Sequence, residues 1–361
     1  MNAVIACGGT GGHLFPGIAV AEVLRDRGHE VLLFVSEKEI DSLALSTRSQ
    51  FRFEKLPTVG LPSIYSPKIF GFGRRFIESL SRCRLIYQKF KPQVVLGMGG
   101  FTSTAPILAG RMRGISTLLH ESNAVPGRAN RLAAKMVRAV LLGFKEAAQF
   151  FPKGRTEITG TPIRNELKRL DRQSARQKLG LQPDVMTMLV MGGSQGASGI
   201  NRLIIKSLPL LREASLQVVH LSGVRDEQLV AENYSRERIP VFAAAFHHHM
   251  EEVYSAADFA VARAGAASLA ELAAFELPAI LIPFPYAADD HQTRNAEIFS
   301  RAGAAFVMKE SEISPELLAQ RIRELIAHPE QLRRMSERSA QLAPRDAANR
   351  VAATMEKYTQ S

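Results

Sequence analysis

The sequence Ala3-Val-Ile-Ala-Cys7, Gly8-Gly-Thr-Gly-Gly12 and His13, with a helical pattern from Leu14 to Arg27, decides the fold of this chain. The run Ala3–Cys7 is apolar and short enough to form a buried strand. Between Leu14 and Arg27, apolar residues recur at helical spacing. Four glycines in five positions lie between these two patterns, where they allow a sharp turn and the close approach of another molecule. The stretch therefore predicts a strand, a glycine loop and a helix, the opening of an α/β domain.

The glycine loop also indicates a class of ligand. The amides at the start of a helix carry the positive end of its dipole, so they suit a phosphate or another electron-rich group. The dinucleotide pattern G-x-G-x-x-G is not met, because counting from Gly9 places Leu14 at the last glycine position. The loop thus predicts an anionic or sugar-like ligand. His13, at the edge of the loop, is a candidate base because an imidazole accepts a proton near neutral pH.

The composition is that of a globular protein with two domains. The chain has 361 residues, too many for one ordinary core, with 46% hydrophobic and 22% charged residues. An excess of 46 Lys and Arg over 35 Asp and Glu predicts an anionic partner, such as a phosphate ligand or acidic lipid headgroups. Nucleic acid ranks last because no known nucleic-acid-binding signature occurs. With no signal-peptide pattern or membrane span, and with the isolated Cys7 and Cys83, we expect a reduced, cytoplasmic compartment.

Strand and helix patterns alternate along the chain in two series, which predicts two doubly wound, Rossmann-like parallel sheets. The expected strands of the first series are Ala3–Cys7, Val31–Val35, Val94–Gly97, Thr117–His120, Ala139–Leu142 and Glu157–Thr159. After a charged, helix-like segment at Asn165–Gly180, those of the second series are Thr187–Met191, Gln217–Leu221, Val241–Ala243, Phe259–Ala262 and Ala279–Pro283. The second series also opens with a strand, a glycine loop (Gly192–Gly196) and a helix (Ala197–Leu211). Helices at Ile313–Ile326 and Pro329–Tyr358 follow, and the first carries an apolar stripe that we expect to pack in the core: Ile313, Leu317, Leu318, Ile322 and Leu325.

The segment Lys68-Ile-Phe-Gly-Phe-Gly-Arg-Arg-Phe76 mixes aromatic and basic residues and allows two interpretations. Its phenylalanines could be buried in a loop that caps a helix. Alternatively, the segment could rest on an anionic membrane, with aromatic rings at the headgroup boundary and cations on lipid phosphates. The residues of this candidate membrane patch are Lys68, Phe70, Phe72, Arg74, Arg75 and Phe76.

Further motifs carry groups suited to binding an anion, a sugar or a pyrophosphate. Gly97-Met-Gly-Gly100 is another glycine loop before a helix, and His120 to Asn130 is dense in hydrogen-bonding groups. Arg263-Ala-Gly-Ala-Ala-Ser268 places small residues where bare amides can face a pyrophosphate. Glu271, one turn further, could bind a ribose diol or only complement the helix dipole. His247-His-His249 predicts no metal site, because adjacent side chains diverge and no carboxylate or Cys cluster accompanies them.

Taken together and in order, these motifs resemble the MurG family of bacterial N-acetylglucosaminyltransferases, which convert lipid I to lipid II in peptidoglycan synthesis. The resemblance runs from residue 1 to about residue 350. It rests on Gly8–His13, Gly97–Gly100, His120-Glu-x-Asn123, Gly160-Thr-Pro-Ile-Arg164, Gly192–Gly196, Arg263-x-Gly-Ala266 and Asp290-His-Gln292. It implies the GT-B fold, in which two domains face a cleft. Residues 1–160 with a C-terminal helix at about 343–361 would bind lipid I and the membrane, and residues 165–342 would bind UDP-N-acetylglucosamine.

The resemblance also assigns roles to residues of this sequence. The donor site would comprise Thr10, Gly11, Gly12, Asn123, Arg164, Ser194, Phe246, His247, Ala266, Ala267, Ser268, Glu271, His291 and Gln292. Arg164 and Ser194 would face the diphosphate, Glu271 the ribose, and His291 and Gln292 the sugar hydroxyls. Gly99 and Gly100 would bind the acceptor pyrophosphate. The small Ala264 and Ala267 and the run His247-His-His249 depart from the family pattern and concern the contacts to uridine.

The implied reaction is an inverting displacement of UDP by the C4 hydroxyl of N-acetylmuramic acid. His13 would be the base, or a hydrogen-bonding residue for the acceptor. Helix-start amides and Arg164 would stabilise the leaving UDP, so neither metal nor cofactor is expected. The expected location is the cytoplasmic face of the bacterial inner membrane, with other wall-synthesis proteins as further partners. The rival functions are a UDP-N-acetylglucosamine epimerase, a GT-B transferase with another acceptor, and a nucleotide-sugar sensor without catalysis.

Overall fold

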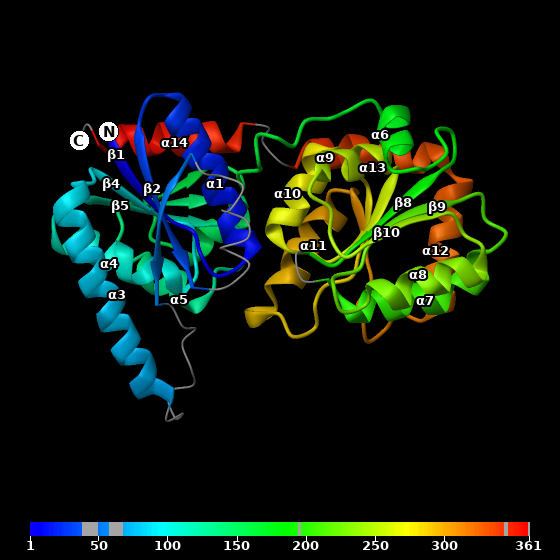
Figure 1. Cartoon of the computed structure of the whole chain (residues 1–361), viewed down its shortest axis with the longest axis horizontal. Helices are drawn as coiled ribbons and strands as arrows, with labels where there is room; N and C mark the ends of the chain where they lie inside the picture. Colours follow the sequence, from blue (N-terminus) through cyan, green and yellow to red (C-terminus); the bar gives the residue numbers. More distant parts are fainter. Residues whose placement is uncertain (38–49, 58–67, 194–195, 343–345, 360–361) are drawn as a thin grey trace. The chain divides into compact units, whose positions relative to one another are not determined.

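The computed structural model describes residues 1–37, 50–57, 68–193, 196–342 and 346–359, which form two compact α/β units (Figure 1). Unit 1 comprises Met1–Asn165 and Pro344–Ser361, and unit 2 comprises Glu166–Ala343. The chain therefore leaves unit 1 for unit 2 and returns to it with its last helix. The predicted fold class, with two doubly wound parallel sheets, is confirmed.

The described residues of unit 1 form a seven-stranded, fully parallel sheet in the order β3-β2-β1-β4-β5-β6-β7. Its strands are β1 (Asn2–Ala6), β2 (Glu30–Ser36), β3 (Arg52–Leu56), β4 (Val94–Gly97), β5 (Ser116–Glu121), β6 (Ala139–Leu142) and β7 (Thr156–Ile158). Its helices are α1 (Gly11–Asp26), α3 (Lys68–Phe90), α4 (Thr104–Met112), α5 (Arg128–Ala133) and α14 (Ala347–Lys357), with short 3-10 turns η1 (Phe101–Ser103) and η2 (Lys145–Phe150).

The last helix, α14, is part of the core of unit 1. Val351, Ala352 and Met355 are fully buried in the same apolar cluster as Ile18 of α1 and Ile5 of β1. Figure 1 shows this helix (red) beside α1 (blue).

The described residues of unit 2 form a six-stranded parallel sheet in the order β10-β9-β8-β11-β12-β13. Its strands are β8 (Thr187–Met191), β9 (Gln217–Leu221), β10 (Val241–Ala244), β11 (Phe259–Ala262), β12 (Ala279–Leu281) and β13 (Ala305–Val307). Its helices are α6 (Arg172–Lys178), α7 (Ser198–Leu211), α8 (Glu227–Glu237), α9 (Met250–Ala256), α10 (Ala266–Ala274), η3 (Ala288–Asp290), α11 (His291–Arg301), α12 (Pro315–Ala327) and α13 (Pro329–Ala340).

Several local expectations were wrong. Strands β3 and β13 were not expected, and the charged segment after Asn165 is helical only from Arg172, where the Asp171 side chain accepts a hydrogen bond from the Ser174 amide and caps the helix. The stretch expected as one helix from Pro329 to Tyr358 is two, α13 and α14. In the apolar stripe of α12, Leu318, Ile322 and Leu325 are buried, but Leu317 is 40% exposed.

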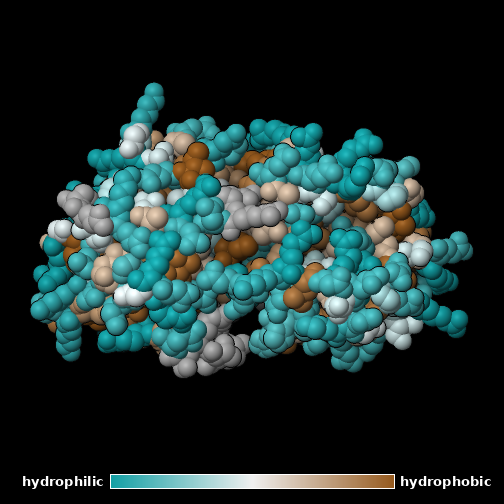
Figure 2. All heavy atoms as spheres, turned by 90° about the horizontal axis from the view of Figure 1, so that it is seen from above, coloured by the Kyte–Doolittle hydropathy of each residue, from teal (hydrophilic) through white to brown (hydrophobic). Residues whose placement is uncertain are grey.

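The surplus of positive charge belongs to unit 1. Its sequence has 26 Lys and Arg against 13 Asp and Glu, whereas unit 2 has 20 against 22. On the face seen in Figure 2, hydrophilic residues predominate and hydrophobic residues form separate spots. Among the described residues, no helix is both long and apolar enough to cross a bilayer.

Candidate active site

The strand order of unit 1 reverses between β1 and β4, and ligands of such sheets bind at the carboxyl ends of the strands flanking this switch point. Strand β1 leads into the loop Cys7–Thr10, and β4 leads into Met98–Gly100. The two strands pair in register, with Ala6 beside Gly97, so both loops start from the same place. A Cβ on Gly8 would overlap the backbone of Val35 and Ser36, which explains a glycine there. The topology thus brings the first two predicted loops together.

His13 lies in the first turn of α1, which begins at Gly11 and not after His13 as expected. Its amide donates to the Thr10 carbonyl at 3.0 Å, and its half-buried ring lies against the loop that follows β4. A Cβ on Gly99 would be 3.0 Å from His13 Cε1, and one on Gly100 would be 3.5 Å from Nε2. Gly99 and Gly100 have φ of 107° and 70°, which other residues rarely adopt. Thr10 and Gly12 are exposed, while Gly11 is buried.

The end of β5 supplies His120, Glu121 and Asn123. His120 is fully buried; its Nε2–H donates to the Gly160 carbonyl at 2.9 Å, so Nδ1 is the acceptor, 3.2 Å from the Ser122 hydroxyl. Burial lowers the pKa of His120 to about 4, so the ring is neutral at physiological pH. Asn123 donates from its backbone and side chain to the Glu121 carboxylate, at 2.8 and 3.1 Å.

Arg164 belongs to unit 1. Its guanidinium lies 4.7 Å from the centre of the Phe15 ring on α1, and the residue is 9% exposed. A cation stacked on an aromatic face is attracted to the ring and has a defined orientation.

Unit 2 repeats this arrangement at its own switch point, between β8 and β11. After β8, Gly193 and Gly196 have φ of 94° and 74°, and a Cβ on Gly196 would collide with the Ser222 carbonyl. The predicted Ser194 lies outside the described residues. After β11, Arg263 is 7% exposed, and its Nη1 donates to the Ile282 and Pro283 carbonyls, each at 3.1 Å.

The start of α10 offers the expected small residues. Gly265 precedes the helix, Ala266 is buried, and Ala267 and Ser268 are partly exposed in its first turn. Glu271 follows one turn later, and its Oε2 accepts a hydrogen bond from the Tyr254 hydroxyl at 2.6 Å. Tyr254 is 1% exposed and fixes the orientation of this carboxylate. Sequence reasoning missed Tyr254, since nothing in the pattern links it to a residue seventeen positions away.

His291 and Gln292 are the first two residues of α11. The Gln292 Oε1 accepts from the Ala264 and Phe284 amides, at 3.2 and 3.0 Å, so its Nε2 group is the end suited to meet a sugar hydroxyl. The His291 Nδ1–H donates to the Ala288 carbonyl at 2.7 Å, which leaves Nε2 as an acceptor.

The three consecutive histidines point to different neighbours. His247 Nε2 is 3.2 Å from Glu252, His248 meets the Phe246 ring edge-on, and His249 is paired with Glu251. Phe246 is 51% exposed beside them. No group of three or more potential metal ligands was found in the part of the chain that the structure describes.

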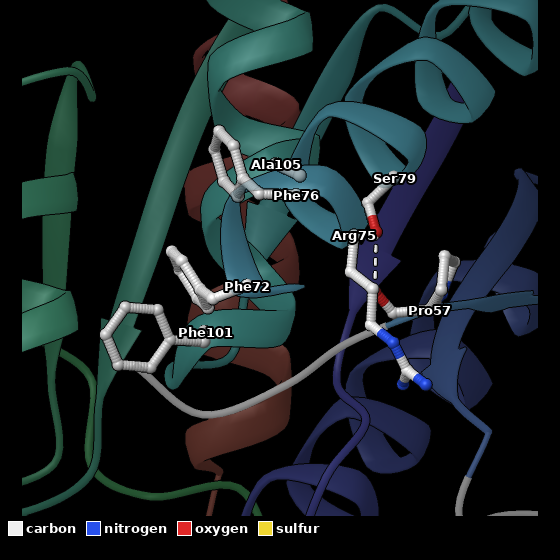
Figure 3. Close-up of a pocket in the computed structure, with 7 residues that line it drawn as sticks. All are labelled: Pro57, Phe72, Arg75, Phe76, Ser79, Phe101 and Ala105. Atoms are coloured by element: carbon white, nitrogen blue, oxygen red, sulfur yellow. Dashed lines mark hydrogen bonds between the residues drawn. The ribbon is translucent and has the colours of Figure 1, made fainter. Parts of the chain in front are cut away.

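The aromatic and basic segment after Lys68 forms the start of α3. Phe72 stacks on Phe76 at 6.1 Å and meets Phe101 edge-on at 5.8 Å, and these rings line a small pocket (Figure 3). On α3 itself, Phe72 and Phe76 are half-buried, whereas Arg74 and Arg75 are exposed. The side chains of Lys68 and Phe70 lie outside the described part of this helix. Phe101 directly follows Gly100, so the patch adjoins the glycine loop beside His13.

Two doubly wound units, each with glycine loops at its switch point, are the architecture of the GT-B fold. Residues 3–142 match the N-terminal domain of glycosyltransferase family 28, and residues 187–351 match the C-terminal domain of the same family. The chain belongs to glycosyltransferase family 28 and is a glycosyltransferase.

Named relatives cover nearly the whole chain. A protein of Geobacter sulfurreducens, 38% identical over 97% of both chains, is named UDP-N-acetylglucosamine--N-acetylmuramyl-(pentapeptide) pyrophosphoryl-undecaprenol N-acetylglucosamine transferase. A relative from Halothermothrix orenii, 38% identical over 95% of both chains, has the same name. Among solved structures, Acinetobacter baumannii MurG is 25% identical, with a TM-score of 0.77 over 99% of both chains. A putative UDP-N-acetylglucosamine 2-epimerase of Listeria monocytogenes has a TM-score of 0.72 over 99% of this chain and 96% of its own, but at 12% identity it shows the fold alone.

The buried, neutral His120 predicts a defined loss of stability in acid. The unfolded chain takes up a proton near pH 6.5, whereas the folded protein resists protonation down to about pH 4. The neutral His120 ring therefore makes its full contribution to the free energy of unfolding above pH 6.5. Up to about 3 kcal/mol of this contribution is lost as the pH falls to 4. Urea unfolding of wild type and His120→Gln between pH 7.5 and 4 measures it. The difference between them should shrink toward acid; a constant difference would contradict the assignment.

Proposed function

We propose that this protein transfers N-acetylglucosamine from UDP-N-acetylglucosamine to the C4 hydroxyl of the N-acetylmuramoyl-pentapeptide of lipid I, forming lipid II. The observation that carries the proposal is the name of the curated relatives, which share 36–38% identity with this chain over nearly its full length. The glycine loops at both switch points support the proposal, because such loops are suited to the anionic groups of a nucleotide-sugar donor and a pyrophosphate-linked acceptor.

We assign the acceptor to unit 1 and most donor contacts to unit 2. Gly99 and Gly100 would offer amides to the acceptor pyrophosphate beside His13, while Thr10, Gly11, Gly12, Asn123 and Arg164, also of unit 1, are assigned to the donor sugar and diphosphate. In unit 2, the remaining donor contacts are Ser194, Phe246, His247, Ala266, Ala267, Ser268, Glu271, His291 and Gln292. Uridine would be read by backbone near Phe246 and His247, and its ribose by Glu271, which Tyr254 orients.

In the reaction, the acceptor O4 forms a bond to the anomeric carbon as the bond to UDP breaks on the opposite face, which inverts the configuration. His13 takes the hydroxyl proton. The UDP that leaves gains negative charge, and the α10 amides with Arg164 stabilise it without a metal ion. The epimerase alternative shares the fold, but it leaves the acceptor loop and the basic helix of unit 1 without a role.

UDP release tests the proposal directly. Purified protein is given UDP-N-acetylglucosamine with or without a short-chain lipid I analogue, in the presence of EDTA. We expect release that requires the acceptor and survives EDTA. If the analogue is inert while the donor still binds, the acceptor assignment is wrong; if EDTA abolishes release, the metal-independent mechanism is wrong.

Removal of the candidate base should affect turnover more than donor binding. His13→Ala should lower kcat by about 10² to 10⁴, the usual contribution of a positioned base, with the Kd for UDP nearly unchanged. Steady-state kinetics and calorimetric titration with UDP measure the two quantities. Turnover near the wild-type level would place the base elsewhere.

We further propose that unit 1 rests on the cytoplasmic face of the bacterial inner membrane, where other wall-synthesis proteins act. Unit 1 holds the positive charge of the chain, and α3 presents an outward face that mixes basic and apolar residues. Arg74, Arg84, Ile77 and Leu85 recur at helical spacing, and the two apolar side chains are 64% and 61% exposed. The apolar residues available to a membrane are therefore Ile77 and Leu85. The sequence had suggested Phe72 and Phe76, but these two rings pack partly inward. Cationic and apolar residues on one face suit an anionic bilayer.

Vesicle binding tests this membrane surface. Arg74→Ala/Arg75→Ala should weaken binding to phosphatidylglycerol-containing vesicles about 30-fold, because each cation near an anionic surface contributes about 1 kcal/mol. The matched control is Arg333→Ala/Arg334→Ala, another exposed adjacent pair, on α13 of unit 2. If both double variants lost vesicle affinity equally, binding would reflect the overall positive charge of the protein, and α3 would not be the membrane contact.

A further inference from the structure

Glu121, at the end of β5, is a carboxylate buried to 1% exposure beside the acceptor loop. Its Oε1 accepts hydrogen bonds from the backbone and side-chain nitrogens of Asn123, and its Oε2 accepts one from Asn130 Nδ2 at 2.7 Å. The Gly127 amide is a further donor. Every one of these partners is an N–H group. Both oxygens of Glu121 must therefore act as hydrogen-bond acceptors. The same N–H groups shield these oxygens from an incoming substrate hydroxyl.

Asn130 connects this carboxylate to the acceptor loop. The residue lies on α5 and is 4% exposed; its Oδ1 accepts from the Gly100 amide at 3.1 Å. The orientation of its amide is fixed by chemistry, because a carboxylate only accepts and a backbone N–H only donates. A Cβ on Gly99 would lie 3.0 Å from Asn130 Nδ2 and 3.0 Å from His13 Cε1. The glycine loop is therefore held between Asn130 and the candidate base.

We infer that Glu121 is a positioning residue that, through Asn130, fixes the Gly99–Gly100 peptide beside His13 and at the same time holds Asn123. This inference rests on the proposed function, in which that peptide binds the acceptor pyrophosphate and Asn123 faces the donor sugar. A single buried group then sets the geometry of both contacts of unit 1. Glu121 itself takes no proton from the acceptor, since its oxygens already receive N–H donors.

Exchanging the two side-chain types provides the test. Glu121→Gln introduces an N–H donor where only acceptors fit, and if Asn130 turns to meet it, an NH₂ group faces the Gly100 N–H. Asn130→Asp places two carboxylates against each other. In Glu121→Gln/Asn130→Asp the roles are exchanged: the new amide at position 121 donates to the new carboxylate at position 130, and that carboxylate accepts from the Gly100 N–H. The pair therefore forms the same connections with donor and acceptor reversed.

Each single variant should lower kcat/KM for the lipid I analogue about 10- to 100-fold, as expected when a buried hydrogen bond to a charged group is lost. The Kd for UDP should change less than twofold. The double variant should be more active than either single variant, because the hydrogen bond between positions 121 and 130 is restored while Gly100 keeps an acceptor. Wild-type kinetics in the single variants, or a double variant no better than the weaker single one, would overturn the inference.

A readout independent of activity separates this inference from the proposed function. In ¹⁵N-labelled protein, the Gly100 amide resonance should shift in Glu121→Gln and return toward its wild-type position in the double variant. Thermal unfolding identifies any variant that does not fold. If wild type transfers no sugar but the resonance behaves as expected, the proposed function fails and the connection stands; a resonance that does not respond refutes the connection.

Discussion

The parallel pairing of β1 with β4, and of β8 with β11, is the constraint on which both candidate sites depend. Each pair stands where the strand order of its sheet reverses, so the connections after its two strands leave toward opposite faces, and ligands of such sheets bind at this point. The register places Ala6 beside Gly97 in unit 1 and Ala262 beside Met191 in unit 2. Two backbones that turn away from neighbouring strands leave little room for side chains. A Cβ on Gly97 would overlap Ser103 and Ile107, so a glycine there follows from the pairing.

The polar groups near the switch point of unit 1 are held mainly by neutral partners. His120 is kept neutral by burial, and the partners of Glu121 found among the described residues are amide N–H groups. A buried polar group is costly when unsatisfied, so each side chain in this cluster has a single favourable orientation. In the arrangement that we propose, the cluster would hold the glycine loop in place before substrate binds, which is the condition for electrostatic preorganisation.

The sequence predicted the fold class and the loops because glycine spacing and strand alternation are local signals. It did not predict β3 and β13, since Arg52–Leu56 carries charges at an edge and Ala305–Val307 is only three residues long. Contacts between distant residues were also beyond it. That Tyr254 orients Glu271, that backbone amides occupy the Gln292 carbonyl, and that Phe101 draws Phe72 inward all depend on tertiary packing. Asn130 stood within a motif recognised as polar, but its partners Glu121 and Gly100 became apparent only once the chain had folded.

The unequal charge of the two units matches the different demands of two anionic substrates. Unit 2 has almost balanced charge, and its buried Arg263 is paired with Glu310 at 2.6 Å. The diphosphate that we propose to bind there would meet mainly the helix-start amides, whose attraction is confined to short range. Unit 1 instead carries a general excess of positive charge, which acts over about a Debye length and favours a surface rather than a single ligand. In the proposed reaction, UDP must leave its site, whereas the lipid-linked acceptor stays at a membrane surface. Short-range attraction in unit 2 and long-range positive charge in unit 1 suit these two requirements.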